Sequence, residues 1–420
     1  MSRYQPYPSY KDSGVEWLGE VPKDWLPKRL KYHARIKNGQ DQKKVLSDNG
    51  QYPVYGSGGE FGRANEYLYD KPSVLLGRKG TIDKPLFIIE PFWTVDTMYY
   101  TDIAKTTFPK FLYYSCLTIK FDYYQYGSAV PSMTQENLHN IDFATPSYEE
   151  QTAIANFLDI QTAKIDTLIA KQQRMIELLG EKRSAMISHA VTKGIDPDVT
   201  LKDSGVEWLG EVPEHWEISK IGFLSSKIGS GKTPRGGSEV YADEGIVFIR
   251  SQNVYDEGLR LDDVVFISKE IDEEMANTRV KAGDILLNVT GASIGRTTLV
   301  PYDFDVANVN QHVCIIRISS IEMRPYIALV MKSATAKTQI DAFQNGAARE
   351  GLNFEQIANI QIALPPLLEQ IAITGYIDTQ TAKIDTLIAK ARQTIELMKE
   401  RRTALISAAV TGKIDVRREA

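Results

Sequence analysis

This 420-residue sequence has only two cysteines, no long hydrophobic run and no net positive charge. The only two cysteines, Cys116 and Cys314, lie far apart without CxxC spacing, which argues against a disulfide framework or a zinc site. We expect both to be buried free thiols. No apolar run approaches the roughly 18 to 20 residues that a membrane-spanning helix needs, and the N-terminus lacks an apolar signal core. These absences predict a cytoplasmic protein that does not span a membrane.

The formal net charge is −5 at pH 7, which argues against a protein that coats nucleic acid without regard to sequence. One short segment is strongly basic nonetheless. Between Lys28 and Lys44, seven basic residues stand against one acid, Asp41. This segment is either a phosphate-contacting stripe or a solvated helix face, and charge alone does not decide between them. The hydrophobic content of 43% is sufficient for two or three globular units.

The chain repeats itself in parts. Residues 11–25, KDSGVEWLGEVPKDW, match residues 202–216 at thirteen of fifteen positions. Residues 161–171, QTAKIDTLIAK, recur without change at residues 380–390, and this similarity extends to both sides. About a hundred residues in the middle of each half have no such match. The pattern indicates that the ends perform one role twice while the middles perform two different roles; a partial gene conversion without functional meaning is the alternative.

Each copy of QTAKIDTLIAK lies in a long segment whose apolar residues alternate at spacings of three and four, the heptad pattern of paired helices. No proline or glycine interrupts the first segment from Tyr148 to Gly180, and Gly194 and Pro197 end it. We expect two helices of about 40 residues, each roughly 60 Å long. The expected packing residues are Ile154, Leu158, Ile165, Leu168, Met175 and Leu179 in the first helix, and Ile373, Ile377, Ile384, Leu387 and Met398 in the second.

A single amphipathic helix of this length cannot bury its own stripe, so each predicted helix needs the other as its partner. The first helix leads into the second half of the chain, and the second must return antiparallel to it. The predicted fold class is therefore α/β (α+β), with two mixed, β-rich domains joined by two long antiparallel coiled-coil helices in a pseudo-two-fold internal repeat. We assign residues 1–146 to the first domain, 147–196 to the central helix, 197–365 to the second domain and 366–420 to the C-terminal helix.

Both middles consist of short β-type runs separated by glycine-rich turns. The runs are SVLLG, LFII, IVFIR, DILLNV and HVCIIRI, which begin at Ser73, Leu86, Ile246, Asp284 and His312. The turns carry arginine and lysine among serine, threonine, asparagine and glutamine. This residue set contacts phosphates and base edges in DNA-binding proteins.

KDSGVEWLGEVPxxW opens each half, LLGRKGTI and PFWTVDTMYY follow in the first, and GSGKTPRGG, GIVFIRSQNV, AGDILLNVTGASIGR and NVNQHV in the second. Together these motifs resemble the specificity subunits of type I restriction-modification systems over nearly the whole chain. The resemblance implies two target-recognition domains, each reading one half of a bipartite asymmetric site in double-stranded DNA. It also implies helices that set the spacer and dock two methyltransferase subunits. From the turns and the resemblance, we expect these residues near DNA: Arg63, Arg78, Lys79, Lys232, Thr233, Arg235, Arg250, Asn253, Thr290, Ser293 and Arg296.

The residues of nucleotide hydrolysis and methyl transfer are missing from the sequence. GSGKT lacks the leading glycine of a phosphate-binding loop, since Ser226 stands there, and Pro234 disfavours helical geometry at Thr233. No Asn-Pro-Pro or Asp-Pro-Pro triplet occurs, and the five histidines have no metal-ligand spacing. We expect a non-catalytic chain without a catalytic residue, metal or cofactor of its own.

The resemblance implies that partner subunits bind S-adenosylmethionine, and ATP with Mg where a restriction-translocase subunit is present. Two alternatives remain: a nucleotide-hydrolysing enzyme, and a scaffold that joins two proteins without touching DNA.

Overall fold

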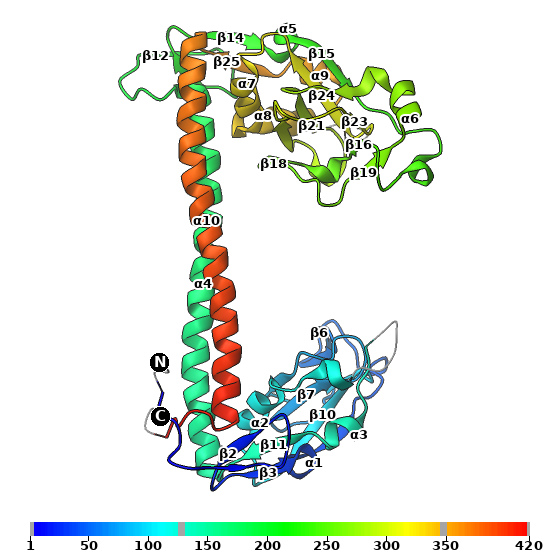
Figure 1. Ribbon diagram of the computed structural model, residues 1–420, viewed down its shortest axis with the longest axis vertical. Helices are drawn as coiled ribbons and strands as arrows, with labels where there is room; N and C mark the ends of the chain where they lie inside the picture. Colours follow the sequence, from blue (N-terminus) through cyan, green and yellow to red (C-terminus); the bar gives the residue numbers. More distant parts are fainter. Residues whose placement is uncertain (1–3, 125–130, 345–350, 418–420) are drawn as a thin grey trace. The chain divides into compact units, whose positions relative to one another are not determined.

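The computed structural model describes residues 4–124, 131–344 and 351–417 (Figure 1). The chain forms two compact units, Met1–Gln173 with Arg392–Ala420, and Arg174–Ala391. Each unit contains one mixed, β-rich domain and half of each of two long helices, α4 (Tyr148–Lys193) and α10 (Leu367–Val410). The predicted fold class is confirmed. The predicted division at residues 146, 196 and 365 stays a prediction, since the compact units share the helices between them.

The domain of the first unit has two sheets. An antiparallel sheet has the order β4–β10–β7–β8, and a smaller sheet has the order β6–β5–β9, in which β5 and β9 are parallel. The strands are β4 (Ala34–Asn38), β5 (Tyr52–Gly56), β6 (Gly59–Ala64), β7 (Ser73–Gly77), β8 (Leu86–Ile88), β9 (Trp93–Thr94) and β10 (Met98–Ile103). Helix α2 (Pro109–Cys116) adds Leu112 and Cys116 to the core that contains Val74 and Leu76.

The four-stranded antiparallel sheet of the second unit has the same strand order as that of the first. Its antiparallel sheet runs β15–β24–β21–β22, and its other sheet runs β19–β16–β23–β20, with β16 and β23 parallel. The strands are β15 (Ser225–Ser230), β16 (Ile246–Ile249), β19 (Val265–Ile267), β20 (Arg279–Val280), β21 (Ile285–Asn288), β22 (Thr297–Leu299), β23 (Ala307–Val309) and β24 (Val313–Ile318). The hairpin β17 (Val254–Tyr255) and β18 (Gly258–Leu259) and the strand β20, which pairs with β23, have no counterpart among the described strands of the first domain. The two middles therefore share one topology although their sequences have diverged, which the sequence analysis did not detect.

All five β-type runs predicted from the sequence are strands, namely β7, β8, β16, β21 and β24. Every residue of β7 and of β21 is buried. This explains why both read as continuous apolar runs rather than as alternating patterns, because both faces of these strands are covered. Cys116 and Cys314 are buried free thiols, as predicted. Burial raises the pKa of both thiols, that of Cys314 to about 12.

Of the eleven residues predicted to pack between the long helices, six are buried, two are partly buried and three are exposed. Buried are Ile154, Leu158, Ile165, Ile373, Ile377 and Ile384, while Leu179 and Met398 are partly buried. Leu168, Met175 and Leu387 are 45%, 38% and 47% exposed, and the partly buried residues beside them are Ile169, Ile176 and Ile388. Each pair offers two adjacent apolar side chains. Periodicity alone cannot choose between neighbours, because only the position of the partner helix decides which one is covered.

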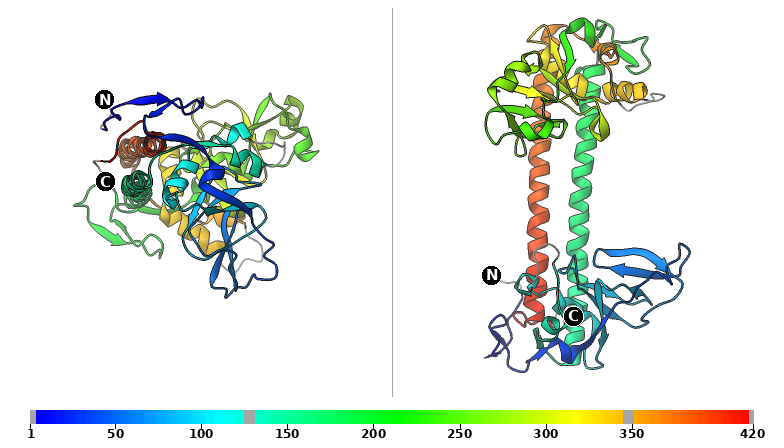
Figure 2. Two further views of the ribbon diagram at one scale, coloured as in Figure 1. Left: turned by 90° about the horizontal axis from the view of Figure 1, so that it is seen from below. Right: turned by 90° about the vertical axis from the view of Figure 1, so that its right-hand side faces the viewer.

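The pairing of α4 with α10 is antiparallel (Figure 2). In the first unit Arg402 Nε lies 2.9 Å from Asp166 Oδ1, and in the second unit Arg183 pairs with Asp385. From Asp166 to Arg183 the chain advances 17 residues along α4, and their partners go back 17 residues along α10. The two ion pairs are equivalent positions of the internal repeat, which is the pseudo-two-fold relation that the sequence predicted.

The repeated tryptophan-containing segments pack against the C-terminal ends of the long helices. In the first unit, Trp25 packs in one core with Ala409 and Val410 of α10, and its indole nitrogen donates to Glu150 Oε2 at 3.1 Å. In the second unit, Trp216 packs with Ala190 and Val191 of α4. The repeat thus specifies one structural unit twice, completed once by α10 and once by α4.

Candidate nucleic-acid interface

In the first unit, the loops that follow β4 and β7 meet the turn between β9 and β10. Gly39 N donates to Met98 O at 3.1 Å, and Arg78 N donates to Thr97 O at 2.8 Å. A Cβ atom on Gly39 would lie 2.0 Å from Val95 O, so only glycine allows this approach. The close backbone contact brings the loops of two sheets together.

The second unit has the same convergence. Gly231 N donates to Val313 O at 3.2 Å, and Lys232 N donates to Val309 O at 3.2 Å. A Cβ atom on Gly231 would lie 1.7 Å from Val309 O. Gly231 therefore occupies the position that Gly39 has in the first unit. This contact explains the glycine before Lys232 in GSGKT without any bound nucleotide, and the element after it is a short 3-10 turn, Gly237–Val240, instead of the α-helix of a phosphate-binding loop.

The predicted residues of the first unit lie in two places. Arg78 and Lys79 follow β7; the Arg78 guanidinium donates to Asp96 O at 3.2 Å, and Lys79 is exposed. Arg63 lies in β6 of the other sheet, where its Nε is 3.2 Å from Glu60 Oε1. Arg78 and Lys79 are the cations that the converging loops place together.

In the second unit a hydrogen-bonded chain joins two predicted residues. The Thr233 hydroxyl donates to Gln311 Oε1, Gln311 Nε2 lies 3.0 Å from His312 Nε2, and His312 Nδ1 lies 2.5 Å from Thr290 Oγ1. Gln311 and His312 belong to the NVNQHV motif, but the sequence analysis did not name them as site residues. Pattern alone did not show that this turn would face the loop after β15.

The Asn253 side chain is buried within its own loop. Its side chain is only 2% exposed; the amide donates to Arg260 O at 2.9 Å, and Oδ1 accepts from Arg250 N at 3.0 Å. The Arg250 guanidinium donates to Asp263 O at 2.9 Å. Because Asn253 is buried and its amide is hydrogen-bonded within the loop, its side chain holds the loop in shape, and the position of this loop near DNA stays a prediction.

The remaining predicted residues surround these contacts. Ser293 Oγ accepts from Asn288 Nδ2 at 3.1 Å. Lys232 and Arg235 are exposed and line a hollow of about 550 Å³ together with Thr233. The Arg296 guanidinium carbon lies 4.7 Å from the centroid of the Tyr255 ring. The loops that follow β15, β16 and β21 thus carry threonine hydroxyls and four predicted cations, Lys232, Arg235, Arg250 and Arg296, and the hydrogen bonds through Gln311 and His312 join the first of these loops to the third.

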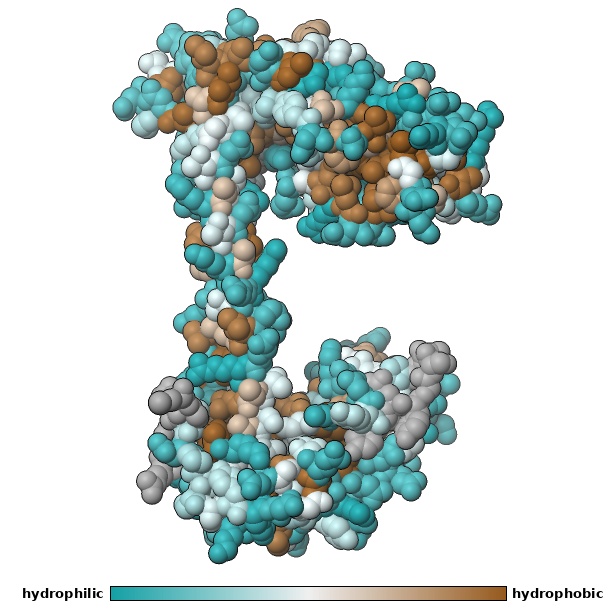
Figure 3. Space-filling model, viewed as in Figure 1, coloured by the Kyte–Doolittle hydropathy of each residue, from teal (hydrophilic) through white to brown (hydrophobic). Residues whose placement is uncertain are grey.

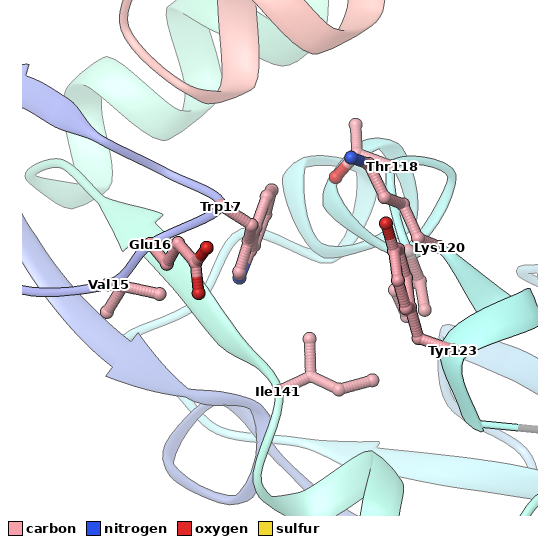
Figure 4. Close-up of a pocket in the computed structure, with 8 residues that line it drawn as sticks. Val15, Glu16, Trp17, Thr118, Lys120, Tyr123 and Ile141 are labelled. Carbon is pink, nitrogen blue, oxygen red and sulfur yellow. The ribbon is translucent and has the colours of Figure 1, made fainter.

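A larger hollow of about 710 Å³ lies elsewhere in the first unit (Figure 4). Figure 4 shows Trp17 and Tyr123 facing it from opposite sides, with Ile141 between them. None of the residues expected near DNA lines it.

Among residues 4–124, 131–344 and 351–417, no group of histidine, cysteine and carboxylate side chains is arranged to hold a metal ion. Over these ranges, no helix has the length and apolar character needed to cross a membrane.

Comparison with known proteins gives a consistent family. A model of the type I restriction modification DNA specificity domain matches residues 22–178 and 213–397. The type I restriction enzyme MjaVIII specificity subunit of Methanocaldococcus jannaschii is 25% identical over 69% of this chain and 66% of its own length. The EcoBI specificity subunit of Escherichia coli is 25% identical over 68% of this chain and 61% of its own length. Both matches thus span less than two thirds of these relatives.

Other comparisons extend over nearly the full chain. The type I restriction enzyme MjaIX specificity subunit of Methanocaldococcus jannaschii is 22% identical over 95% of both chains. A solved chain described under "Structural basis underlying complex assembly and conformational transition of the type I R-M system" covers 93% of this chain and 98% of its own, with 14% identity and a TM-score of 0.63. At that identity the likeness concerns the fold alone. Because the family model covers both repeats and both β-rich domains, the chain belongs to the type I restriction-modification DNA specificity family.

Proposed function

We propose that this chain is the DNA-recognition subunit of a type I restriction-modification methyltransferase, and that each β-rich domain reads one half of a bipartite asymmetric site. The observation that carries the proposal is one topology with unlike loop side chains. Gln40 and Lys232 follow the equivalent glycines, and Arg78 and Val289 follow the equivalent strands β7 and β21. Two domains that share one architecture but carry different loop side chains suit two different half-sites.

The long helices are proposed to set the spacer between half-sites. Four residues correspond to a helix rise of about 6 Å, which is close to two base-pair steps of roughly 3.4 Å. Inserting four residues in α4 between Thr162 and Ile187, with a matching insertion in α10, should lengthen the spacer by one to two base pairs. Both half-site sequences should stay the same. An unchanged spacer in a complex that still methylates DNA would contradict this role of the helices.

The repeated segments are proposed to dock two methyltransferase subunits, and restriction-translocase subunits join where restriction is present. In support, Trp17 and Trp208 occupy the same repeat position and are 37% and 36% exposed. Figure 3 shows hydrophobic residues gathered where α10 begins, and Leu367, Leu368 and Ile371 are exposed there. Exposed apolar groups of this kind suit a partner surface. The partners would bind S-adenosylmethionine, and ATP with Mg, and would supply the catalysis in the cytoplasm.

The deciding experiment is a genome-wide map of methylated adenines in cells with and without this gene. We expect a split motif that disappears with the gene. Replacing the first β-rich domain with that of another family member should change one half-site only. A single continuous motif would contradict two separate readers, and full function of an Arg78→Gln and Arg296→Gln double variant would favour the scaffold alternative.

A further inference from the structure

Tyr255 in the second unit has two guanidinium groups against its ring. The guanidinium carbon of Arg260 is 3.6 Å from the ring centroid, and that of Arg296 is 4.7 Å from it. Tyr255 ends β17, Arg260 follows β18, and Arg296 precedes β22. The added hairpin of this domain thus brings a second arginine to the residue that was expected near DNA. The sequence analysis did not name Tyr255 or Arg260, because residue type alone does not show that they meet Arg296, which lies 36 residues beyond Arg260 in the chain.

Neither guanidinium has a carboxylate partner among the residues that the structure describes. The adjacent acid, Asp256, is occupied: it pairs with Lys337, and its Oδ1 accepts from Thr297 N at 2.9 Å. Two like charges on one ring repel each other, and the ring offsets only part of that repulsion. The positive charge of this cluster is therefore available to a ligand that supplies acceptor atoms.

The backbone on both sides of the ring is fixed by buried asparagines. Asn253 Nδ2 donates to Arg260 O at 2.9 Å, and Arg260 N donates to Asn253 O at 2.9 Å. Asn288, which is fully buried, donates its backbone N–H to Arg296 O at 2.9 Å. With the backbone held and each guanidinium lying against the ring, the freedom of each donor fork to turn is restricted before any ligand arrives.

We propose that Arg260 and Arg296 read guanine in the half-site of the second domain, and that Tyr255 is the positioning residue that sets their donor planes. The inference rests on the proposed function. A phosphate accepts a lysine ammonium as well as an arginine fork and is the same at every base pair, so a phosphate contact does not require a fixed donor plane. The O6 and N7 atoms of guanine require two parallel donors in the plane of the base, which a stacked arginine supplies.

The test replaces each arginine by lysine in the full methyltransferase complex and maps the methylated motif. Arg260→Lys and Arg296→Lys keep the charge but lose the paired donors. We expect discrimination for guanine at one position of the second half-site to fall about tenfold or more for each variant. The first half-site and the spacer should stay unchanged. An Arg78→Gln variant identifies the half-site of the first domain and serves as the reference.

Tyr255 is tested by a matched pair of variants. Tyr255→Phe keeps the ring and should preserve the motif, since no hydrogen bond of the hydroxyl is part of the proposal. Tyr255→Leu should relax the same position as the arginine variants, whereas Tyr302→Leu, which removes an exposed tyrosine of the same domain, should not. Thermal unfolding of the Tyr255→Leu chain separates lost positioning from lost structure.

The outcomes separate this inference from the function on which it rests. If the lysine variants keep the full motif, or weaken binding equally at every sequence, then charge is sufficient and the guanine-reading inference is wrong. If the unaltered protein specifies no split motif at all, the proposed function fails first. A split motif without guanine in the second half-site would overturn the inference and leave the proposed function standing.

Discussion

The first and second β-rich domains each hold cations against aromatic rings, but the charges around these cations differ. In the first, Lys37 lies 5.7 and 5.8 Å from the ring centroids of Tyr69 and Tyr100, and Asp102 Oδ2 is 3.3 Å from its ammonium nitrogen. In the second, the guanidinium groups on Tyr255 have no such carboxylate among the described residues. The strand order of the four-stranded antiparallel sheet is the same in both. One scaffold can thus carry unlike electrostatics, because buried apolar residues and close glycine contacts hold the strands while the charged side chains lie at the surface.

The strongest test of the shared scaffold is Gly231→Ala. A Cβ atom at Gly231 meets Val309 O at 1.7 Å, so backbone must move, and we expect a loss of more than about 4 kcal/mol in the free energy of unfolding. Gly39→Ala should have a similar effect on the first domain, where the corresponding distance is 2.0 Å. Denaturant unfolding measures both.

Gly229→Ala is the matched control for Gly231→Ala. The nearest atom to a Cβ at Gly229 is Lys227 Cε at 3.9 Å, which is ordinary contact. Its unfolding free energy should change by less than about 1 kcal/mol. If Gly231→Ala proved as mild as Gly229→Ala, the close approach would not define the scaffold.

The helix seam is tested by neighbouring apolar residues in both repeats. Ile384 is 5% and Leu387 is 47% exposed in α10, and their repeat equivalents Ile165 and Leu168 are 8% and 45% exposed in α4. Ile384→Ala and Ile165→Ala should each cost about 2 to 5 kcal/mol of unfolding free energy. Leu387→Ala and Leu168→Ala should cost clearly less. Equal losses within each pair, measured by denaturant unfolding, would place the seam where periodicity alone predicted it.

Acid should destabilise the first domain through a buried histidine, His33. The second domain lacks a histidine at the equivalent position and should not lose stability in this way. His33 is 2% exposed, with its ring nitrogens 3.1 and 3.0 Å from the hydroxyls of Thr107 and Thr145. Burial, aided by the charge of Lys28, lowers the pKa of His33 from 6.5 to about 4. The repeat-equivalent residue in the second unit is Leu224, which does not titrate.

The sign follows from which state binds the proton. Above pH 6.5 the His33 ring is uncharged in the folded and the unfolded state, and its contribution to the free energy of unfolding is complete. As the pH falls from 6.5 to about 4, only the unfolded chain gains the proton. Stability should decrease by about 3 kcal/mol across this window. His33→Gln should remove this part of the pH dependence in urea unfolding, whereas His189→Gln, at an exposed site of α4, should not. Equal pH dependence in wild type and His33→Gln would refute the assignment.

Much of the fold was predictable because its signals are local. Heptad spacing identified both long helices, and turn residues delimited the five strands that were found. The internal repeat also required two equal helices to be partners. The shared topology of the diverged middles was not predictable, since the equivalent residues Val74 and Ile285 are buried against different neighbouring sequences. For the candidate site, residue type suggested Arg78 and Arg296.

The amino-acid sequence by itself determined the duplication, the heptad helices and the chemistry of the loops, because each depends on residue order along one segment. Tertiary structure alone decided three matters: that Ile169 instead of Leu168 is covered, that Asn253 is buried within its loop, and that Arg260 joins Arg296 on Tyr255. Each depends on which distant segment lies opposite. Burial and stacking are properties of a pair of surfaces, and one of the two is always elsewhere in the chain.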